Sequence, residues 1–178
     1  AGIADGLPDL FITHWVTQEN ALYFSQLGAA GKLEYRDKTR QFDLGEISID
    51  RVGWGCAFVD LDRDGRVDIA VANGSTLEQN EDALLLKPEP LFLFLNTGTT
   101  FRDVAPASGT DAARLYAARG LAAADYDGDG DVDLALSCNQ GTPVLLRNDS
   151  PTSHRSISLR LRGRAAFCRG AKVEVASG

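Results

Sequence analysis

The chain has 178 residues, of which 44% are hydrophobic and 24% are charged, and 18 of them are glycine. This composition fits a globular β protein with many tight turns, and no apolar run approaches the roughly 20 residues of a membrane-spanning helix. The formal net charge is −7 and the body of the chain has no block of lysine and arginine. A nucleic-acid partner is therefore not expected.

The chain begins with an incomplete acidic loop. Asp5, Gly6 and Asp9 match the fifth, sixth and ninth positions of a nine-residue pattern that recurs twice further along. Ala1 and Ile3 stand at the first and third positions, where the complete pattern has aspartate, so half of the acidic ligands are missing. We therefore expect Asp5 and Asp9 to form a partial metal site at most.

Short apolar runs after this loop predict β-strands. Leu10–Thr13 comes first, and Ala21–Gln26 follows it and ends in a polar turn. An aromatic-Arg-Asp step then appears at residues 35–37, and the glycine-containing segment 53–55 leads into the next loop. The same order of features recurs later in the chain, which indicates a structural repeat.

The first complete acidic loop reads DLDRDGRVD and spans residues 60–68. Its carboxylates repel one another, so the folded loop needs a cation among them. Oxygen ligands on a short turn favour a hard ion, above all calcium, and Gly65 permits the sharp bend. The predicted ligands are the side chains of Asp60, Asp62, Asp64 and Asp68 and the backbone carbonyl of Arg66.

An EF-hand is the obvious alternative for such a loop, and the spacing argues against it. An EF-hand needs an acidic residue at position 12, between two helices, whereas Val71 occupies that position here. The flanking segments Cys56–Val59 and Ile69–Ala72 are short apolar runs typical of buried strands. We therefore expect a strand–calcium loop–strand hairpin; the alternative is a solvated turn that binds nothing.

Two further features lie beyond this hairpin. Residues 78–90 form an insertion relative to the neighbouring repeats, and its acidic start and proline-bounded end predict a surface loop. The apolar patch Ala83–Leu86 within it is expected to pack on a partner or a neighbouring blade. Asn73 begins a glycosylation sequon in a predicted loop, and the sequon at Asn148 is weaker because Pro151 follows it.

The second complete loop reads DYDGDGDVD and spans residues 125–133. It repeats the aspartate positions of the first, with Gly130 at the bend and Leu136 at position 12. The approach segment Leu121–Ala124 could form a strand or, because alanine favours it, a helix. The predicted ligands are the side chains of Asp125, Asp127, Asp129 and Asp133 and the carbonyl of Asp131. Two bound calcium ions would change the net charge from −7 to −3 (−7 plus four).

The spacing of the loops predicts the architecture. Asp60 and Asp125 lie 65 positions apart, and four short strands per unit of about 60 residues is typical of a β-propeller blade. We predict an all-β chain of about three four-stranded antiparallel blades, at residues 1–52, 53–117 and 118–150. So few blades leave open ends. The chain is therefore expected to be part of a larger propeller, or else to pack against a partner or a second copy of itself.

The repeat resembles the FG-GAP/VCBS type of integrin α-chain propellers and secreted bacterial proteins. The segments GWGCAFVDLDRDGRVDIAVANG, LFLFLNTGTTFRDVAPASG and RGLAAADYDGDGDVDLALS are similar to the cartilage acidic protein 1 group. Residues 151–178 resemble the start of an ASPIC/UnbV domain, although the segment is too short for a complete one. The resemblance implies a calcium-stabilised propeller, of a seven-bladed type, that binds partners outside the cytoplasm and has no general enzymatic activity.

The three cysteines and the two histidines do not form a recognisable catalytic or zinc site. Cys56, Cys138 and Cys168 lack the CxxC spacing of a thiolate metal site. Free buried thiols are the favoured interpretation, with one disulfide as the alternative. His14 and His154 lie at opposite ends of the chain, and no serine has a nucleophile-elbow setting. We therefore predict that the chain is not an enzyme.

These features predict a calcium-binding propeller module that is extracellular or periplasmic and serves adhesion, protein interaction or structural assembly. Its partner is expected to be a protein or a surface glycan. The alternative is an accessory carbohydrate-binding propeller of a secreted carbohydrate-active enzyme. Trp15 and Trp54 could then form a sugar platform, although we favour a place for both in the core. A structural subunit of a surface assembly is a third possibility.

Overall fold

The structure is a computed structural model that describes residues 5–15, 17–79, 82–139 and 141–151, together with residues 154, 159, 161–163 and 173. The side chains of residues 76–86 are not among those described. Most of the ASPIC/UnbV-like segment, the site of Cys168 and the patch Ala83–Leu86 therefore lie outside the described side chains. Among the described residues, no helix is long and apolar enough to cross a membrane.

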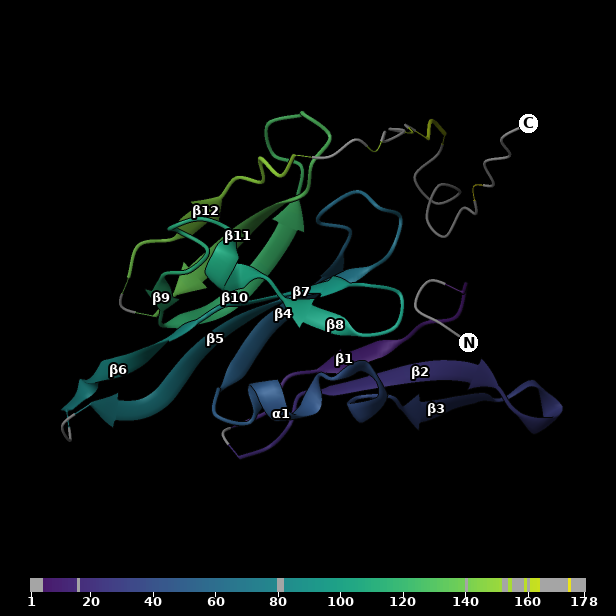
Figure 1. The fold of residues 1–178 in the computed structure, drawn as a ribbon, viewed down its shortest axis with the longest axis horizontal. Helices are drawn as coiled ribbons and strands as arrows, with labels where there is room; N and C mark the ends of the chain where they lie inside the picture. The colour runs from purple at the N-terminus through teal and green to yellow at the C-terminus, as the bar shows by residue number, and fades with distance from the viewer. Residues whose placement is uncertain are drawn as a thin grey trace.

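The strands form three antiparallel sheets, which we call blades 1 to 3 (Figure 1). Blade 1 contains β1 (Leu10–Ile12), β2 (Ala21–Leu27) and β3 (Leu33–Asp37). Blade 2 contains β4 (Gly53–Val59), β5 (Asp68–Gln79), β7 (Phe92–Asn96) and β8 (Phe101–Asp103). Blade 3 contains β10 (Ala118–Ala124), β11 (Asp133–Cys138) and β12 (Val144–Leu146).

The predicted all-β class is confirmed. The sheet of blade 2 has six described strands, because a further hairpin strand and a short strand extend the four named above, and blades 1 and 3 have three described strands each. The alanine-rich approach to the second loop is strand β10 rather than helix. Helical structure among the described residues is limited to short turns. These are α1 (Gly45–Ser48) and the 3₁₀ turns η1 (Ala29–Gly31), η2 (Arg40–Phe42) and η3 (Ala105–Ala107).

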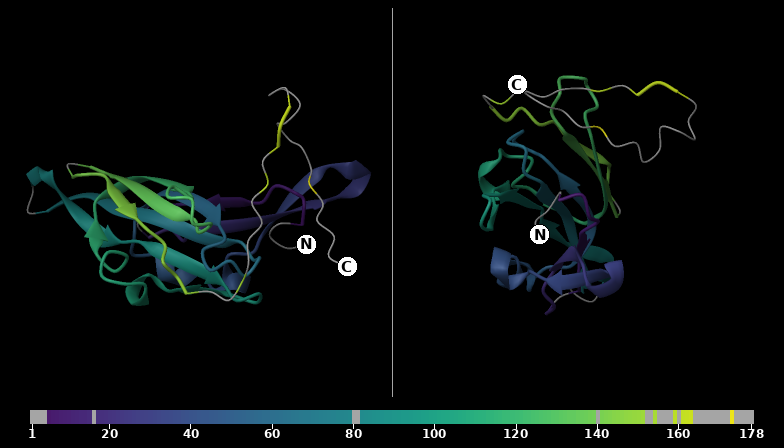
Figure 2. Two further views of the ribbon diagram at one scale, coloured as in Figure 1. Left: turned by 90° about the horizontal axis from the view of Figure 1, so that it is seen from above. Right: turned by 90° about the vertical axis from the view of Figure 1, so that its right-hand side faces the viewer.

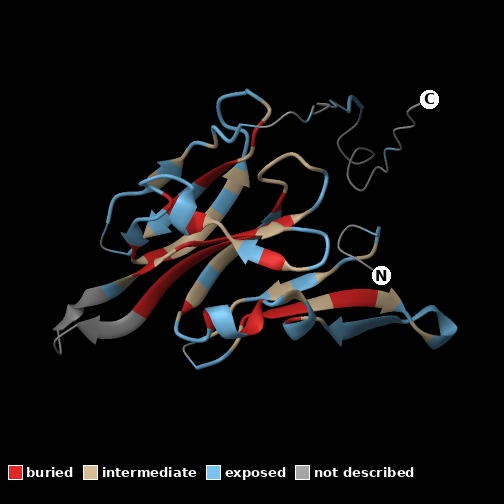
Figure 3. Cartoon of the chain, in the orientation of Figure 1, coloured by how far each residue is buried: buried red, intermediate tan, exposed pale blue. Residues whose placement is uncertain are grey.

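Blade 2 lies between the other two blades, and residues 68–75 of strand β5 are buried on both faces (Figure 3). Because side chains alternate along a strand, Ile69 and Val71 pack toward blade 1, in a cluster with Leu22 and Phe24. Ala70 packs toward blade 3, in a cluster with Leu134. Burial on both faces explains why the run after the first loop is continuously apolar rather than alternating.

The prediction of a surface loop at residues 78–90 is wrong. Strand β5 continues to Gln79 and pairs antiparallel with β6 (Asp82–Pro90). Strand β6 in turn pairs with the short strand β9 (Leu115–Tyr116). The β5–β6 pair and the β2–β3 hairpin project at opposite ends of the molecule (Figure 2). Continued strand pairing satisfies the backbone polar groups that a loop would have left to water.

The sequon at Asn73 is not in a loop either. Asn73 lies in β5 and is fully buried, and its Nδ2 donates a hydrogen bond to the carbonyl of Pro90 at 2.8 Å. Asn148 is half-buried and donates from Nδ2 to the carbonyl of Leu61, also at 2.8 Å. A glycan needs a free, solvent-facing amide nitrogen, so neither asparagine is an acceptor in the folded chain.

The preferred placement of the tryptophans is also wrong, because Trp15 and Trp54 are 46% and 37% exposed. The Arg119 guanidinium covers the Trp54 ring, 4.5 Å from the ring centroid. Cys56 and Cys138 are free, as favoured, and are half-buried. Burial raises the pKa of both thiols, which keeps them protonated and unreactive at neutral pH.

Candidate calcium sites

Both complete acidic loops join the ends of paired antiparallel strands. In blade 2 the pair that closes the loop is Val59 with Asp68, and in blade 3 it is Ala124 with Asp133. The predicted strand–loop–strand hairpin is therefore confirmed at both places. Gly65 and Gly130 have φ of +83° and +94°, a left-handed conformation that glycine adopts without steric cost.

Each loop gathers three carboxylates. In the first loop, oxygens of Asp60, Asp62 and Asp68 all lie within 4.8 Å of one another, and in the second the same holds for Asp125, Asp127 and Asp133. The aspartates at position 5 fall outside these clusters. Asp64 forms an ion pair with the guanidinium of Arg66, and Asp129 accepts a hydrogen bond from the backbone N–H of Asp131 at 2.9 Å. The complete ligand sets, including the carbonyls of Arg66 and Asp131, stay a prediction.

The first aspartate of each loop also shapes the turn. The carboxylate of Asp60 accepts hydrogen bonds from the N–H groups of Asp64 and Gly65, at 3.1 and 3.0 Å. In the second loop Asp125 accepts from the N–H groups of Gly128 and Gly130, at 2.7 and 3.1 Å. These hydrogen bonds orient both carboxylates toward the inside of the turn.

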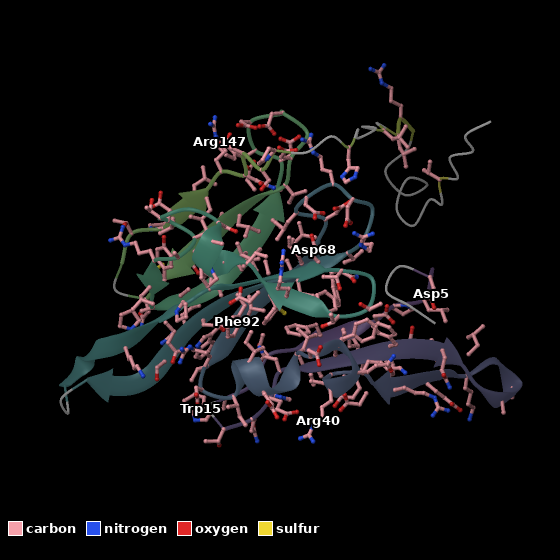
Figure 4. The ribbon with its side chains drawn as sticks, in the orientation of Figure 1. Asp5, Trp15, Arg40, Asp68, Phe92 and Arg147 are labelled. Carbon is pink, nitrogen blue, oxygen red and sulfur yellow. The ribbon has the colours of Figure 1, made fainter. Side chains whose placement is uncertain are left out.

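The aspartate at position 9 accepts hydrogen bonds from equivalent positions in the two loops. It is only 1% exposed in each. Asp68, which is labelled in Figure 4, accepts hydrogen bonds from the N–H groups of Leu61 and Asn96, both at 2.8 Å. Asp133 accepts from those of Tyr126 and Asn148, at 3.1 and 2.8 Å. The position-9 aspartate therefore links the start of its loop to the residue at the end of the neighbouring strand, which is β7 in blade 2 and β12 in blade 3.

Burial of this kind is unfavourable for a charged group. Loss of solvation, together with the nearby Asp62 and Asp60, raises the pKa of Asp68 to about 6, although its two backbone hydrogen bonds act in the opposite direction. The folded chain is therefore destabilised when Asp68 ionises without a cation beside it. Hard divalent ions such as calcium prefer oxygen ligands. Three carboxylates that are clustered and partly desolvated on a tight turn therefore suit such an ion.

The incomplete N-terminal loop keeps part of this arrangement. Asp9 accepts a hydrogen bond from the N–H of Ser25 at 2.8 Å, as Asp68 does from Asn96. Asp5 accepts from the N–H of Leu7 at 3.1 Å, as Asp64 does from Arg66. Neither residue belongs to a cluster of three metal-binding groups among the described residues. Blade 1 therefore shares the turn, and its ability to bind an ion stays a prediction.

A family model of FG-GAP-like repeats matches residues 4–71 and 79–136. The chain belongs to the FG-GAP-like repeat family. Each match ends shortly after one of the two complete acidic loops, in β5 and in β11. No curated protein matches the chain, and the more specific resemblance to the cartilage acidic protein 1 group and its ASPIC/UnbV domain stays a prediction.

The two acidic loops of this FG-GAP protein contact each other, which the sequence pattern did not predict. Nε of Arg63, in the first loop, lies 2.7 Å from the carboxylate of Asp131, in the second. The bond between Asn148 and the carbonyl of Leu61 links the same two regions. The sequence analysis also did not predict that Asn96 and Asn148 bind the position-9 aspartates. Their positions could have revealed this role, because each asparagine ends the corresponding apolar run of its repeat, LFLFLN or PVLLRN.

A cavity of about 530 Å³ lies beside both loops of the FG-GAP protein, between blades 2 and 3. Its walls are mostly apolar and include Leu93, Leu134 and Leu146, while Asp62 and Arg147 supply polar groups. Cavities of this size with a few polar groups are typical of ligand or side-chain binding sites.

The Arg63→Ala variant should be less stable than the Arg63→Gly variant. The residue has a left-handed backbone, with φ of +58°, where the second loop has Gly128. Both substitutions remove the ion pair with Asp131, but only glycine relieves the backbone strain of about 1 kcal/mol. We expect Arg63→Gly to exceed Arg63→Ala in free energy of unfolding by about that amount in urea denaturation. Equal stabilities would show that position 63 does not keep this backbone conformation.

Proposed function

We propose that this chain is a calcium-binding FG-GAP propeller module that works outside the cytoplasm in protein interaction, adhesion or structural assembly, and that it is not an enzyme. The observation that carries the proposal is the pair of equivalent carboxylate clusters, Asp60/Asp62/Asp68 and Asp125/Asp127/Asp133. FG-GAP repeats often bind calcium and are typically found in extracellular proteins. Millimolar calcium outside the cell suits sites of modest affinity.

The proposed role of the sites is structural. A bound calcium ion would offset the repulsion among the three carboxylates of a loop. Asp60 and Asp125 hold the turn through its backbone N–H groups, while Asp68 and Asp133 connect it to the neighbouring strand. The result is a fixed end for each hairpin. The surface around the loops, including the cavity between blades 2 and 3, is then presented to a partner in one shape.

Calcium titration tests this proposal. We expect calorimetry on chelator-stripped protein to show about two sites per chain and the melting temperature to rise with calcium. A site with a dissociation constant near 10 μM would add about 2.7 kcal/mol at 1 mM calcium. Asp60→Ala and Asp125→Ala should each abolish one site and leave the other, which assigns the sites. An absence of calcium-binding heat, with an unchanged melting temperature, would refute the proposal.

A further inference from the structure

A continuous path of hydrogen bonds joins the two position-9 aspartates and crosses from blade 2 to blade 3. Asp68 accepts from the N–H of Leu61, and the carbonyl of Leu61 accepts from Nδ2 of Asn148. The N–H of Asn148 then donates to Asp133. Each of these three hydrogen bonds is 2.8 Å long. A movement of Leu61 or Asn148 therefore changes the surroundings of a predicted ligand in both loops.

The ion pair between Arg63 and Asp131 is a second connection. Nε of Arg63 lies 2.7 Å from the Asp131 carboxylate, and the two side chains are only 24% and 11% exposed. Arg63 stands between Asp62 and Asp64 in the first loop. In the second loop the N–H of Asp131 donates to Asp129. The ion pair thus joins the middle of one acidic loop to the middle of the other.

A comparison of the two blades shows which contact is additional to the repeat. Asn96 and Asn148 both donate from the backbone N–H to the position-9 aspartate of their own blade. Their Nδ2 atoms also donate to the residue before that aspartate, at 3.1 Å to the carbonyl of Val67 and 3.3 Å to that of Val132. The 2.8 Å bond from Asn148 to Leu61 is a further contact, and it leads into the other blade.

We propose that these contacts couple the two calcium sites, so that filling one loop raises the calcium affinity of the other. The inference concerns the regulation of the sites in the proposed function and rests on it. A loop whose carboxylates are held by an ion presents fixed contacts to its neighbour. The neighbouring loop then loses less conformational freedom when it binds, which gives positive cooperativity. By linkage the effect is equal in both directions, and we expect about a tenfold change in affinity.

Electrostatic repulsion between the two ions acts in the opposite direction. An ion bound in one loop weakens the attraction of the other loop for a second ion. The aspartates at positions 1 and 3 are half-buried in the first loop and exposed in the second. Solvent and salt therefore screen the repulsion, over about 8 Å at physiological ionic strength. We expect the coupling to be positive and to persist in about 1 M KCl, where the screening length is about 3 Å.

Calcium calorimetry on three chelator-stripped proteins measures the coupling. The three are the full chain, Asp60→Ala, which keeps the second site, and Asp125→Ala, which keeps the first. Each single-site protein should bind calcium about tenfold more weakly than the same site does in the full chain once its neighbour is filled. The binding curve of the full chain should therefore be steeper than the sum of the two single-site curves.

Arg63→Gly and Asn148→Ser together remove both connections between the loops. Each substitution introduces the residue that another blade has at the equivalent position, Gly128 in the second loop or Ser25 in blade 1. We therefore expect the double variant to fold, which circular dichroism checks. Its binding curve should equal the sum of the curves of its own two single-site versions.

The matched controls are Arg147→Ala and Asn96→Ser. Arg147 is an arginine beside the second loop that pairs with Asp127 and Asp149 of its own blade, and the amide of Asn96 donates within blade 2. Each control changes a residue next to one site without breaking the contacts between the loops. The affinity of that one site can shift, but the coupling should be unchanged.

Two results would overturn the coupling and leave the proposed function intact. One is a full chain whose binding curve equals the sum of the single-site curves. The other is a double variant that binds calcium more weakly but stays as cooperative as the parent, because Arg63 and Asn148 would then support the loops without connecting the sites. A full chain that shows no calcium-binding heat would instead reject the proposed function, and the coupling with it.

Discussion

Asp68→Ala is expected to lower the free energy of unfolding by about 3 to 5 kcal/mol in calcium. The substitution leaves the N–H groups of Leu61 and Asn96 without their acceptor and removes one of the three clustered carboxylates. In chelator the loss should be smaller, because the cost of ionising a carboxylate with a raised pKa is removed at the same time. Urea denaturation with and without calcium measures both values.

The control for this comparison is Asp50→Ala. Asp50 is an exposed aspartate outside the loops, so its removal should change stability by no more than about 0.5 kcal/mol. Asp133→Ala should reproduce the behaviour of Asp68→Ala, since its hydrogen-bond partners are equivalent. If Asp68→Ala were equally destabilising in calcium and in chelator, Asp68 would be a hydrogen-bond acceptor and not a metal ligand.

Gly55→Ala is expected to separate blades 2 and 3 and to lower the free energy of unfolding by about 2 to 3 kcal/mol. A Cβ on Gly55 would lie 2.4 Å from the backbone nitrogen of Leu121 and 2.9 Å from the carbonyl carbon of Gly120. These are backbone atoms of β10, so the strand itself has to move. Thermal and urea denaturation of the variant measure the effect.

Gly120→Ala is the matched control, because Gly120 is the equivalent residue of blade 3. A Cβ there would approach the side chain of Ser137, with Oγ at 2.6 Å, and no backbone atom is within 4 Å among its nearest contacts. A hydroxyl can rotate away, so the loss should be below about 1 kcal/mol. Equal effects of the two substitutions would mean that the close approach of β4 to β10 does not limit stability.

The fold and the position of the sites follow from local sequence patterns. Aspartates at fixed spacing with a glycine at the bend, between apolar runs, define the hairpins at residues 60–68 and 125–133. The register of β5 follows as well, because a strand buried on both faces needs the continuous apolar run Ile69–Ala72. These features depend on residues that are close together in the chain. The acidic loop and its flanking apolar runs also occur in two copies, so each copy supports the interpretation of the other.

The features that sequence analysis missed depend on contacts between distant residues. Residues 78–90 have the composition of a loop, yet pairing of β5 with β6 outweighs that preference. The contact between Arg63 and Asp131 depends on how two blades pack, which no local pattern encodes. The position of Trp54 likewise depends on a distant residue. Its aromatic ring suggests a place in the core, but the ring is partly exposed and contacts the guanidinium of Arg119.

Strand β5 has a consequence for how this family can vary. Its consecutive residues contact different blades: Ile69 and Val71 meet blade 1, while Ala70 meets blade 3. Each residue is therefore constrained by a different set of distant neighbours. In a deep alignment we expect position 69 to covary with Leu22 and Phe24, and position 70 with Leu134. Evolutionary coupling along this strand should thus alternate with a period of two residues. Odd positions should covary with blade 1 and even positions with blade 3, so that one short segment reports on both blade interfaces.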